Sequence, residues 1–401
     1  MSTIVQKYGG TAVGTVENMQ RIADEVIRKK QEGYNIVIVV SAMGKTTDNL
    51  IEMAKSISNN PCKRDLDMLM ATGEQVSISL LSMIFNEKGY DAISLIGAQA
   101  GIRTEGIHTR SRIVEIDIGR VKRYLEEGKI VVVAGFQGIN EFGDITTLGR
   151  GGSDTTAVAL AAKLQCTCEI YTDVEGIYSV DPRLFPEAKK LDYISYEEMM
   201  EMSSLGAKVM ESRSVEIACK YKIPIYVASS HKRTKGTYIK EIDKDMEQKS
   251  ITGLSVSDNV LMVTISRIPY SPENISKIFG KLASQEVNID MISQTSPQGG
   301  YVNISFTANK EDEPTVNRVM EELKNEIFTM EVKKDNNITK ISVIGMGMRN
   351  EPGVASKVFH LFADNSINFK QVTTSEISIS YTIDASDKQK AINVLCKAFN
   401  L

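Results

Sequence analysis

The chain has 401 residues, of which 42% are hydrophobic and 24% charged, and it carries a formal net charge of -4. This length favours two or three globular domains, and the small negative charge argues against nucleic acid or an anionic membrane surface as a partner. The five cysteines are scattered, the N-terminus lacks a signal peptide's apolar stretch, and no run approaches the roughly 18 apolar residues of a membrane span. We therefore expect free thiols, no membrane anchoring and a cytoplasmic location.

The first part of the chain, up to about residue 228, alternates short β-branched runs with longer segments of helical period. This alternation predicts an α/β domain in which a mainly parallel sheet is sandwiched by helices. The expected strands are residues 3–8, 36–41, 91–96, 129–134, 169–172 and 225–229, and the expected helices are residues 18–30, 48–58, 64–86, 119–127, 155–164 and 207–221. The polar segment 230–250 is expected to be a linker, so the first domain is predicted to span residues 1–240.

Beyond the linker the sequence repeats itself with an offset of 80 residues. PENISKIFGKLASQEVN from Pro272 aligns with PGVASKVFHLFADNSIN from Pro352, and the strands 261–266 and 340–344 precede the two copies in the same register. Each copy reads as strand, helix, strand, strand, helix, strand. This order predicts two small α+β domains of the ferredoxin-like βαββαβ type, each a four-stranded sheet with two helices on one face.

Two loops that follow the first two predicted strands contain residues suited to phosphate. Lys7 and the glycine pair after it could hold an anion through a mobile positive charge and backbone N–H groups. The second loop, SAMGKTTD from Ser41, resembles the end of a P-loop but has Val39 where that motif needs glycine, so we reject a P-loop. A purely steric turn in the first loop, and helix capping by Thr47 or Asp48 in the second, stay open as structural alternatives.

The segment TTLGRGGSDTT from Thr146 opens a predicted helix of small residues. Arg150 can grip a carboxylate with two hydrogen bonds, the glycines and the helix start can hold negative oxygens, and Asp154 can orient a lysine or a metal. A structural turn would need only one glycine and one cap, so this richer pattern favours a functional site.

A third loop, residues 172–183, follows the fifth predicted strand and could hold the adenine and ribose of a nucleotide. Its acids alone fit a solvated loop, but Tyr178 with Arg183 behind a proline fits one less readily. The three histidines share no neighbourhood in the sequence, and no Ser/His/Asp or Cys/His arrangement is found, so we assign them no role.

Seven segments taken together resemble the aspartate kinase (aspartokinase) family of the amino acid kinase superfamily. In chain order they are KYGGTAVG, VVSAMGKTTD, ATGEQVS, VAGFQG, TTLGRGGSDTTA, YTDVEGIYSVDPR and LGAKV. The C-terminal repeat is similar to the paired ACT domains of that family, and the length resembles the short monofunctional members. The resemblance implies transfer of the γ-phosphoryl group of ATP, with Mg²⁺, to the β-carboxylate of L-aspartate. The product would be 4-phospho-L-aspartate, the first intermediate toward lysine, threonine and methionine.

The resemblance also implies roles for individual residues, carried over by position. The catalytic residues would be Lys7, Asp154 and Lys208, with the two lysines on the transferred phosphate and Asp154 organising them. The aspartate-binding residues would be Thr47, Glu74, Arg150, Gly151, Gly152 and Ser153. The nucleotide-binding residues would be Lys7, Tyr8, Gly9, Gly10, Ser41, Thr172, Asp173, Tyr178, Asp181, Arg183 and Lys208. No side chain is assigned to Mg²⁺, which is expected to arrive with ATP.

The two ACT domains would sense an end-product amino acid. By resemblance one is inserted in the other, so residues 260–335 would form the inserted domain, and residues 245–259 with 336–401 would form the second. The effector-binding residues would be Asn288, Ile289, Asp290, Gln294, Val354, Ala355, Asn368, Phe369, Glu376 and Ile377. The first copy has Glu273 where the second has Gly353, so the two copies can differ in whether they bind an effector. Lysine is the first expectation, and threonine alone or both together are left open. Pairing of ACT domains implies at least a dimer.

Two other functions stay open at this point. A related carboxylate kinase acting on glutamate or N-acetylglutamate would share the glycine loops but should lack the combination of VVSAMGKTTD, GRGGSDTT and two ACT copies. A non-catalytic regulator that only senses amino acids would not need the set of charged residues found here, Lys7, Asp154, Arg150 and Lys208.

Overall fold

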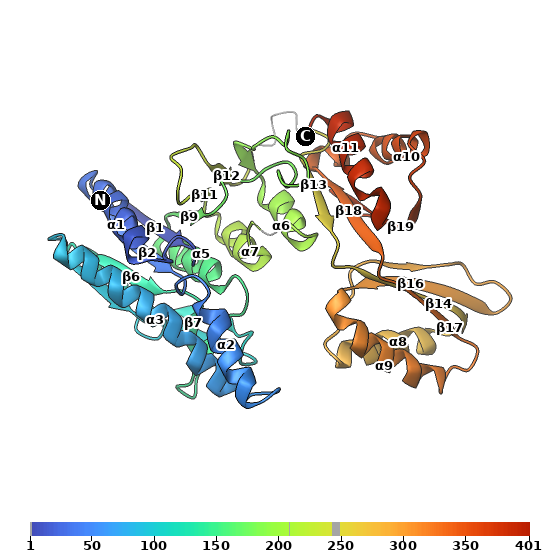
Figure 1. Ribbon diagram of the computed structural model, residues 1–401, viewed down its shortest axis with the longest axis horizontal. Coiled ribbons are helices and arrows are strands. Elements are labelled where there is room, and N and C mark those ends of the chain that lie inside the picture. The colour runs from blue at the N-terminus through green and yellow to red at the C-terminus, as the bar shows by residue number, and fades with distance from the viewer. Residues whose placement is uncertain (1, 208, 243–248) are drawn as a thin grey trace. The chain divides into compact units, whose positions relative to one another are not determined.

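The computed structural model describes residues 2–207, 209–242 and 249–401 (Figure 1). These residues form two compact units. Residues 2–177, 190–203 and 209–242 make up the first unit, and residues 178–189, 204–207 and 249–401 the second. The segment 178–189 thus belongs with the C-terminal unit and not, as expected from the sequence, with the first domain.

The first unit contains an eight-stranded sheet with the order β10-β12-β11-β9-β1-β2-β6-β3. Every neighbouring pair is parallel except β11 with β12. Its strands are β1 Thr3–Tyr8, β2 Asn35–Val40, β3 Ala92–Leu95, β6 Ile130–Ala134, β9 Thr167–Thr172, β10 Tyr193–Ile194, β11 Ile225–Ser229 and β12 Thr237–Ile239. The expected linker is wrong in part, because Thr237–Ile239 pairs with β11 and β10 at the edge of this sheet.

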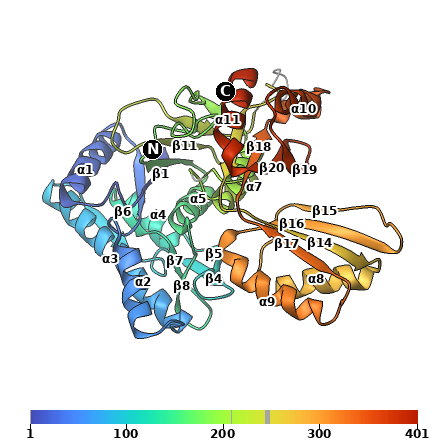
Figure 2. The same ribbon diagram turned by 45° about the vertical axis from the view of Figure 1, so that its right-hand side comes forward.

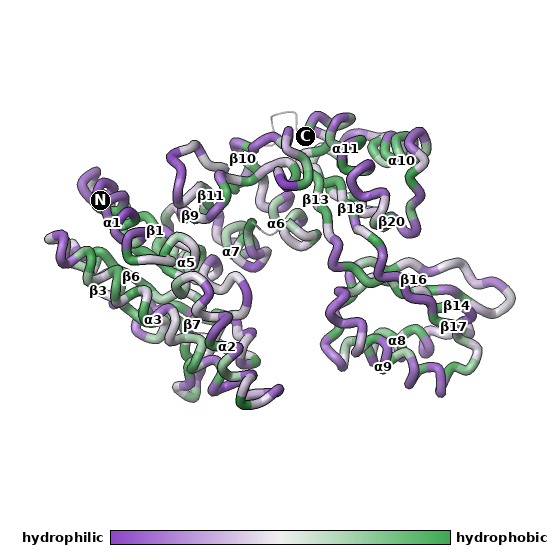
Figure 3. The backbone as a smooth tube through the Cα atoms, viewed as in Figure 1, coloured by the Kyte–Doolittle hydropathy of each residue, from purple (hydrophilic) through white to green (hydrophobic). Residues whose placement is uncertain are grey.

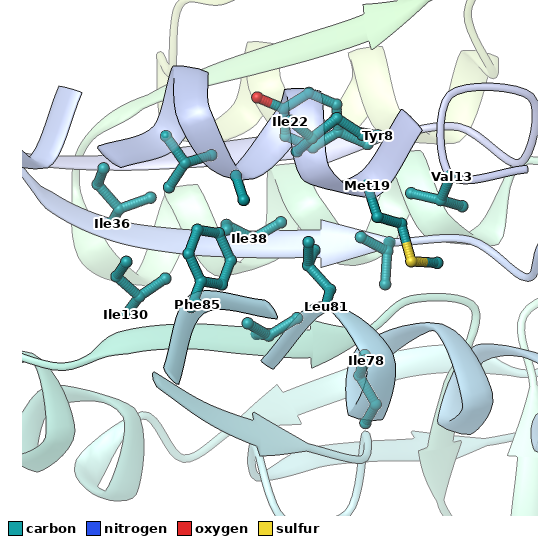
Figure 4. Close-up of a cluster of buried hydrophobic side chains, with 14 of the residues drawn as sticks. Tyr8, Val13, Met19, Ile22, Ile36, Ile38, Ile78, Leu81, Phe85 and Ile130 are labelled. Carbon is teal, nitrogen blue, oxygen red and sulfur yellow. The ribbon is translucent and has the colours of Figure 1, made fainter. Parts of the chain in front are cut away.

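Seven helices accompany the sheet in the described part of the first unit. They are α1 Val16–Gln31, α2 Thr46–Ile57, α3 Lys63–Glu87, α4 Gly119–Glu126, α5 Gly152–Leu164, α6 Tyr196–Ser204 and α7 Ser212–Tyr221. Apolar side chains of α1 and α3 pack with those of β1, β2 and β6, as Ile22, Ile38 and Phe85 illustrate in Figure 4. Along α1 polar and apolar residues alternate in colour, as expected for a helix with one buried face (Figure 3).

The opposite face of the sheet is packed by α5, whose residues from Gly152 to Ala162 are all buried. Small side chains allow this helix to lie against β1, β2 and β9. The cluster that α1 and α3 form with the sheet is called the α1–α3 core below. Because successive side chains of a strand point to opposite faces, Ile4 and Tyr8 of β1 join this core, whereas Lys7 points toward α5. This alternation delivers one lysine to the buried start of α5.

A second, four-stranded sheet of the first unit, with the order β5-β4-β7-β8, lacks any counterpart in the sequence expectations (Figure 2). Its strands are β4 Ile102–Glu105, β5 Arg112–Ile116, β7 Gln137–Ile139 and β8 Ile145–Thr147. Strand β8 lies against α3 and ends immediately before the glycine-rich turn that opens α5. The small sheet therefore supports that turn.

The second unit contains two four-stranded antiparallel sheets, β15-β16-β14-β17 and β13-β18-β20-β19. The elements are β13 Gly253–Ser257, β14 Leu261–Pro269, α8 Pro272–Ser284, β15 Ile292–Gln294, β16 Tyr301–Ala308, η1 Lys310–Asp312, α9 Glu313–Lys324, β17 Glu331–Asp335, β18 Ile338–Ile344, η2 Met346–Arg349, α10 Val354–Asp364, β19 Phe369–Thr374, β20 Ser378–Asp384, η3 Ala385–Asp387 and α11 Lys388–Phe399. Because β13 pairs with β18, the whole β14–β17 domain is inserted between two strands of the other sheet.

The cores of the second unit explain why segment 178–189 belongs to it. Val180 and Phe185 are buried among residues of β13, β18 and α10, and the backbone N–H of Leu254 donates to the carbonyl of Ser179 at 2.7 Å. Burial of these two apolar side chains stabilises the packing of the segment on the second unit, although the segment also contains polar residues.

Helix α3 is, among the described helices, the one that is long and apolar enough to cross a membrane, although the sequence analysis expects no such run. Half of its most apolar window is buried inside the protein. A core helix of a soluble protein meets the same criterion, so this is weak evidence for a membrane span.

Candidate active site

Lys7 and Asp154 form an ion pair at the centre of the candidate site. The Nζ atom of Lys7, at the end of β1, lies 2.6 Å from Oδ1 of Asp154 in the first turn of α5, and both side chains are nearly buried, at 11% and 12% exposed. Gly9 and Gly10 form the glycine loop that follows β1. A Cβ added to Gly9 would lie 3.6 Å from the same Nζ, so the ammonium group lies beneath this glycine loop. A lysine paired through one of its three N–H groups keeps the others for an incoming anion.

The glycine loop after β1 touches the loop after β2. The backbone N–H of Gly44 donates to the carbonyl of Gly10 at 2.9 Å. A Cβ at Gly10 would come within 2.8 Å of the carbonyl oxygen of Ala42, closer than real Cβ contacts. Only glycine fits at position 10, because the backbone of the second loop approaches it too closely for a side chain.

Glu74 lies beneath the loop that follows β2. The carboxyl group of this α3 residue is 3% exposed and accepts a hydrogen bond from the N–H of Ala42 at 3.0 Å, while its Oε2 atom has no partner among the described residues. Burial raises the pKa of Glu74 to about 7, and the N–H of Ala42 partly opposes this shift. A buried carboxylate with an unpartnered oxygen favours a cationic ligand. Thr47 is half-buried in the first turn of α2 and is not its N-cap.

The turn from Gly149 to Ser153 joins β8 to α5. Gly149 and Gly151 have φ angles of 79° and 68°, values that glycine adopts without strain, and Gly152 packs against Phe136. The turn leaves Arg150 exposed and Ser153 buried at the start of the helix. An exposed guanidinium beside helix N–H groups can bind a carboxylate.

Glu211 was not found by sequence reasoning, although it lies just after the LGAKV motif. A Cβ added to Gly151 would come within 2.5 Å of the Cβ of Glu211, so the two residues are in direct contact. Burial raises the pKa of Glu211, the charge of Asp154 adds to this, and the charges of Arg213 and Arg150 oppose it. The carboxyl group of Glu211 therefore interacts with the charges of Arg150 and Asp154 at the turn from Gly149 to Ser153, called the Arg150 turn below. The helix expected from residue 207 begins only at Ser212, because Glu211 is extended.

Apart from Lys7, Gly9, Gly10 and Lys208, the predicted nucleotide residues fall into three groups. Ser41, Thr172 and Asp173 lie at or just after the carboxyl ends of β2 and β9, with Asp173 exposed. The side chain of Tyr8 instead stacks on Tyr171 inside the α1–α3 core, with ring centroids 4.9 Å apart, so only its backbone can face a phosphate.

The third group belongs to the second unit. Tyr178, Asp181 and Arg183 lie in segment 178–189, and Arg183 forms an ion pair with Asp181 at 2.7 Å that lowers the pKa of this carboxyl group. They are not among the residues that the first unit brings together. Lys208, expected to be catalytic, lies outside the described residues.

The predicted effector residues lie on both ACT-like folds, and Asn288 and Ile289 of the first copy correspond to Asn368 and Phe369 of the second. Asp290 forms an ion pair with the buried Lys340, and Glu376 pairs with Arg349 at 2.9 Å. Val354 is buried in the core of its own domain. The others are Asn288, Gln294, Asn368 and Phe369, which are exposed, and Ile289, Ala355 and Ile377, which are partly buried.

Comparison with protein families and known proteins agrees with this architecture. Residues 2–229 match the amino acid kinase family, and residues 275–328 and 341–399 each match the ACT domain. Aspartokinase 2 of Bacillus subtilis is 48% identical to the chain, covering 100% of it and 98% of the relative. The aspartokinase of Pseudomonas aeruginosa is 43% identical, with the same coverage of 100% and 98%.

Solved structures lead to the same family. The aspartate kinase of Synechocystis is 42% identical, with a TM-score of 0.56 over 100% of this chain and 69% of that one. Aspartokinase III of Escherichia coli, solved with aspartate and ADP, shares the fold with a TM-score of 0.81 at 24% identity, over 99% of both chains. As its motifs predict, the chain belongs to the aspartokinase family and combines an amino acid kinase domain with two ACT domains.

Proposed function

We propose that the protein transfers the γ-phosphoryl group of ATP to the β-carboxylate of L-aspartate, giving 4-phospho-L-aspartate and ADP. The observation that carries this proposal is the Lys7–Asp154 pair, buried between the glycine loop and the Arg150 turn. The E. coli relative bound to aspartate and ADP supports both ligands.

The chemistry asks for positioning and charge neutralisation more than for covalent help. The β-carboxylate is already a nucleophile, so no base is needed to activate it. Lys7 neutralises charge on the transferred phosphoryl group, and Asp154 holds the lysine in place. Lys208 is proposed to act from the other side of the phosphate.

Mg²⁺ is proposed to bind mainly through the phosphates of ATP. The described residues contain no cluster of three or more metal-ligating side chains, and Mg²⁺ commonly needs only one or two carboxylates besides the nucleotide. Asp154 is the carboxylate that this geometry offers to it. When bound, the metal would draw negative charge from the phosphate oxygens.

Aspartate is proposed to be held by the two charged groups on its α-carbon, which leaves its β-carboxylate to meet the phosphate. Arg150 would bind its α-carboxylate with support from Gly151 to Ser153, and Thr47 would contact it from the start of α2. Glu74 would bind its ammonium group, because that group restores a partner to the buried Oε2 atom. Burial destabilises the ionised form of Glu74, so an ammonium group beside it would stabilise that form strongly.

The ACT domains are proposed to bind lysine, threonine or both and to reduce turnover when they do. The E. coli relative was also solved with lysine and aspartate, which supports this class of effector. A homodimer formed through the ACT domains and a cytoplasmic location complete the proposal, and the described cysteines are all free, as a reducing compartment requires.

An assay of ADP release tests the proposed reaction against its alternatives. The protein is given ATP and Mg²⁺ with aspartate, glutamate or N-acetylglutamate, each with and without lysine and threonine. We expect turnover with aspartate alone and inhibition by at least one of the two amino acids. Turnover with another acceptor, or with none, would reject the proposal.

A further inference from the structure

We propose that Asp67 is a positioning residue for the aspartate site, acting through Thr147 on the turn that carries Arg150. This inference rests on the proposed role of Arg150 in binding aspartate. Asp67 lies in α3, and its carboxyl group is fully buried.

The carboxyl group of Asp67 joins three segments that are distant in sequence. Both of its oxygens accept the backbone N–H of Thr109 at 3.0 Å, Oδ2 also lies 2.7 Å from Nδ1 of His108, and Oδ1 accepts the hydroxyl of Thr147. With both oxygens engaged in this way, Asp67 acts on a ligand only through the groups that it holds.

Thr147 is the last residue of β8, three positions before Arg150. Its carbonyl oxygen accepts the N–H of Ser111 at 2.9 Å, and the next carbonyl, that of Leu148, accepts Nη1 of Arg213 at 2.8 Å. The backbone is therefore fixed up to the residue at which the glycine-rich turn begins. The hydroxyl bond to Asp67 is the link between this frame and α3.

The loop that Asp67 holds also contacts the turn directly. A Cβ added to Gly149 would lie 3.1 Å from the carbonyl oxygen of Thr109. Thr109 itself has a φ angle of 73°, a conformation that a β-branched residue rarely adopts. Such a residue persists when its surroundings over-determine it, and here the two hydrogen bonds from its N–H to Asp67 do so. The loop's shape is imposed by Asp67.

A buried carboxyl group with this set of partners fixes the positions of the groups that it binds, and removing it would leave their buried donors unsatisfied. Small displacements of a clamp residue are expensive in catalysis, where about 1 Å can cost about 100-fold. We therefore expect that loss of the Asp67–Thr147 bond weakens aspartate binding and leaves ATP binding nearly intact.

Steady-state kinetics of Asp67→Ala, Asp67→Asn and Thr147→Val test this inference. We expect Asp67→Ala and Thr147→Val to raise the KM for aspartate about 10-fold or more, with the KM for ATP within about 2-fold of the parent. Asp67→Asn, which keeps one acceptor oxygen, should have a smaller effect. Because part of the effect of Asp67 passes through its bond to Thr147, Asp67→Ala should raise the KM for aspartate less in a protein that already carries Thr147→Val than in the parent.

Asp144→Ala is the matched control. Asp144 lies next to the other end of β8 and accepts Nε of Arg64 in the same helix, α3, at 2.8 Å. Because Arg64 is about half exposed, this ion pair contributes little to stability, so Asp144→Ala should lower the melting temperature only slightly and leave the KM for aspartate unchanged.

The inference is overturned if Thr147→Val and Asp67→Asn both leave the KM for aspartate within 2-fold, or raise it only in proportion to the KM for ATP. These two variants decide the question even if Asp67→Ala does not fold. Arg150→Ala separates this failure from a failure of the proposed function. If it raises the KM for aspartate while the Asp67 and Thr147 variants do not, only the inference fails; if it does not, the proposed site fails.

Discussion

The proposed role of Glu74 predicts that aspartate binding depends on pH. Its carboxyl group is 3% exposed and has one unpartnered oxygen, and burial raises its pKa to about 7. The proposed role requires the ionised form, because only a carboxylate attracts the substrate's ammonium group. Affinity for aspartate should therefore rise as Glu74 loses its proton.

The magnitude follows from the pKa. Near pH 6 about one-tenth of Glu74 is ionised, and near pH 8 about nine-tenths, so the KM for aspartate should be about 10-fold higher at pH 6 than at pH 8. The carboxylates of aspartate itself titrate well below this window. Glu74→Gln cannot ionise, so it should raise the KM at pH 8 and lose the pH dependence between these values.

The same shift predicts an effect on stability of opposite sign. The folded-state pKa is raised above the unfolded value of 4.5, so the native state binds more protons between about pH 4.5 and 7, and stability falls as the pH rises through this window. A shift from 4.5 to about 7 corresponds to about 3 kcal/mol, fully felt above pH 7. Glu74→Gln should therefore stabilise the ligand-free protein at pH 8 relative to the parent, and much less at pH 5.

Two measurements check this reasoning: the KM for aspartate at half-unit steps from pH 6 to 8, and chemical denaturation of parent and variant at pH 5 and 8. The KM for ATP over the same range is the control. A KM for aspartate that is flat with pH in the parent, or a Glu74→Gln variant that keeps the parent's pH profile, would refute the assignment of Glu74 to the ammonium group.

Three further predictions concern the groups around the phosphate and the substrate. Lys7→Ala should lower kcat at least ~100-fold, the scale of losing a main electrostatic stabiliser. A rate of phosphoryl transfer near that of the parent, measured in single-turnover experiments, would reject its role. Arg150→Ala should raise the KM for aspartate more than it lowers kcat; an unchanged KM in initial-rate measurements would assign the clamp to another group. Gly10→Ala places a Cβ within 2.8 Å of the carbonyl of Ala42, so it should weaken ATP binding, measured by calorimetry, whereas Gly33→Ala on a surface turn should not.

The large sheet and its helices were predictable because their hydrophobic periods are strong. Strand β1 was expected at 3–8 and is found at Thr3–Tyr8, since it opens with β-branched residues and ends at a pair of glycines. The repeat of 80 residues likewise shows two related folds without any structure. Short strands such as β7 and β8, three residues each, carry no readable period and were missed.

Long-range packing accounts for the other differences. Nothing in the local sequence around Val180 and Phe185 tells that they complete the core of the second unit, because that core is formed mostly by residues beyond 250. Thr237–Ile239 reads as part of a polar linker, and only pairing with β11 makes it a strand.

The candidate site was predictable where chemistry is concentrated in one motif. Lys7 and Asp154 were expected to meet, and they do at 2.6 Å. Asp67 and Glu211 gave no such signal, because a single acid near a helix start is common and acquires meaning only from its neighbours in space. Tyr8 shows the opposite case, since its place in a glycine motif suggested a ligand contact while strand alternation turns its ring into the core.

Trapping the acyl phosphate with hydroxylamine tests the central claim most directly. With ATP, Mg²⁺ and L-aspartate the protein should form the aspartyl hydroxamate at the rate of ADP release, and Lys7→Ala should form about 1% of it or less. Release of ADP without hydroxamate, or equal hydroxamate formation by the parent and Lys7→Ala, would contradict the account.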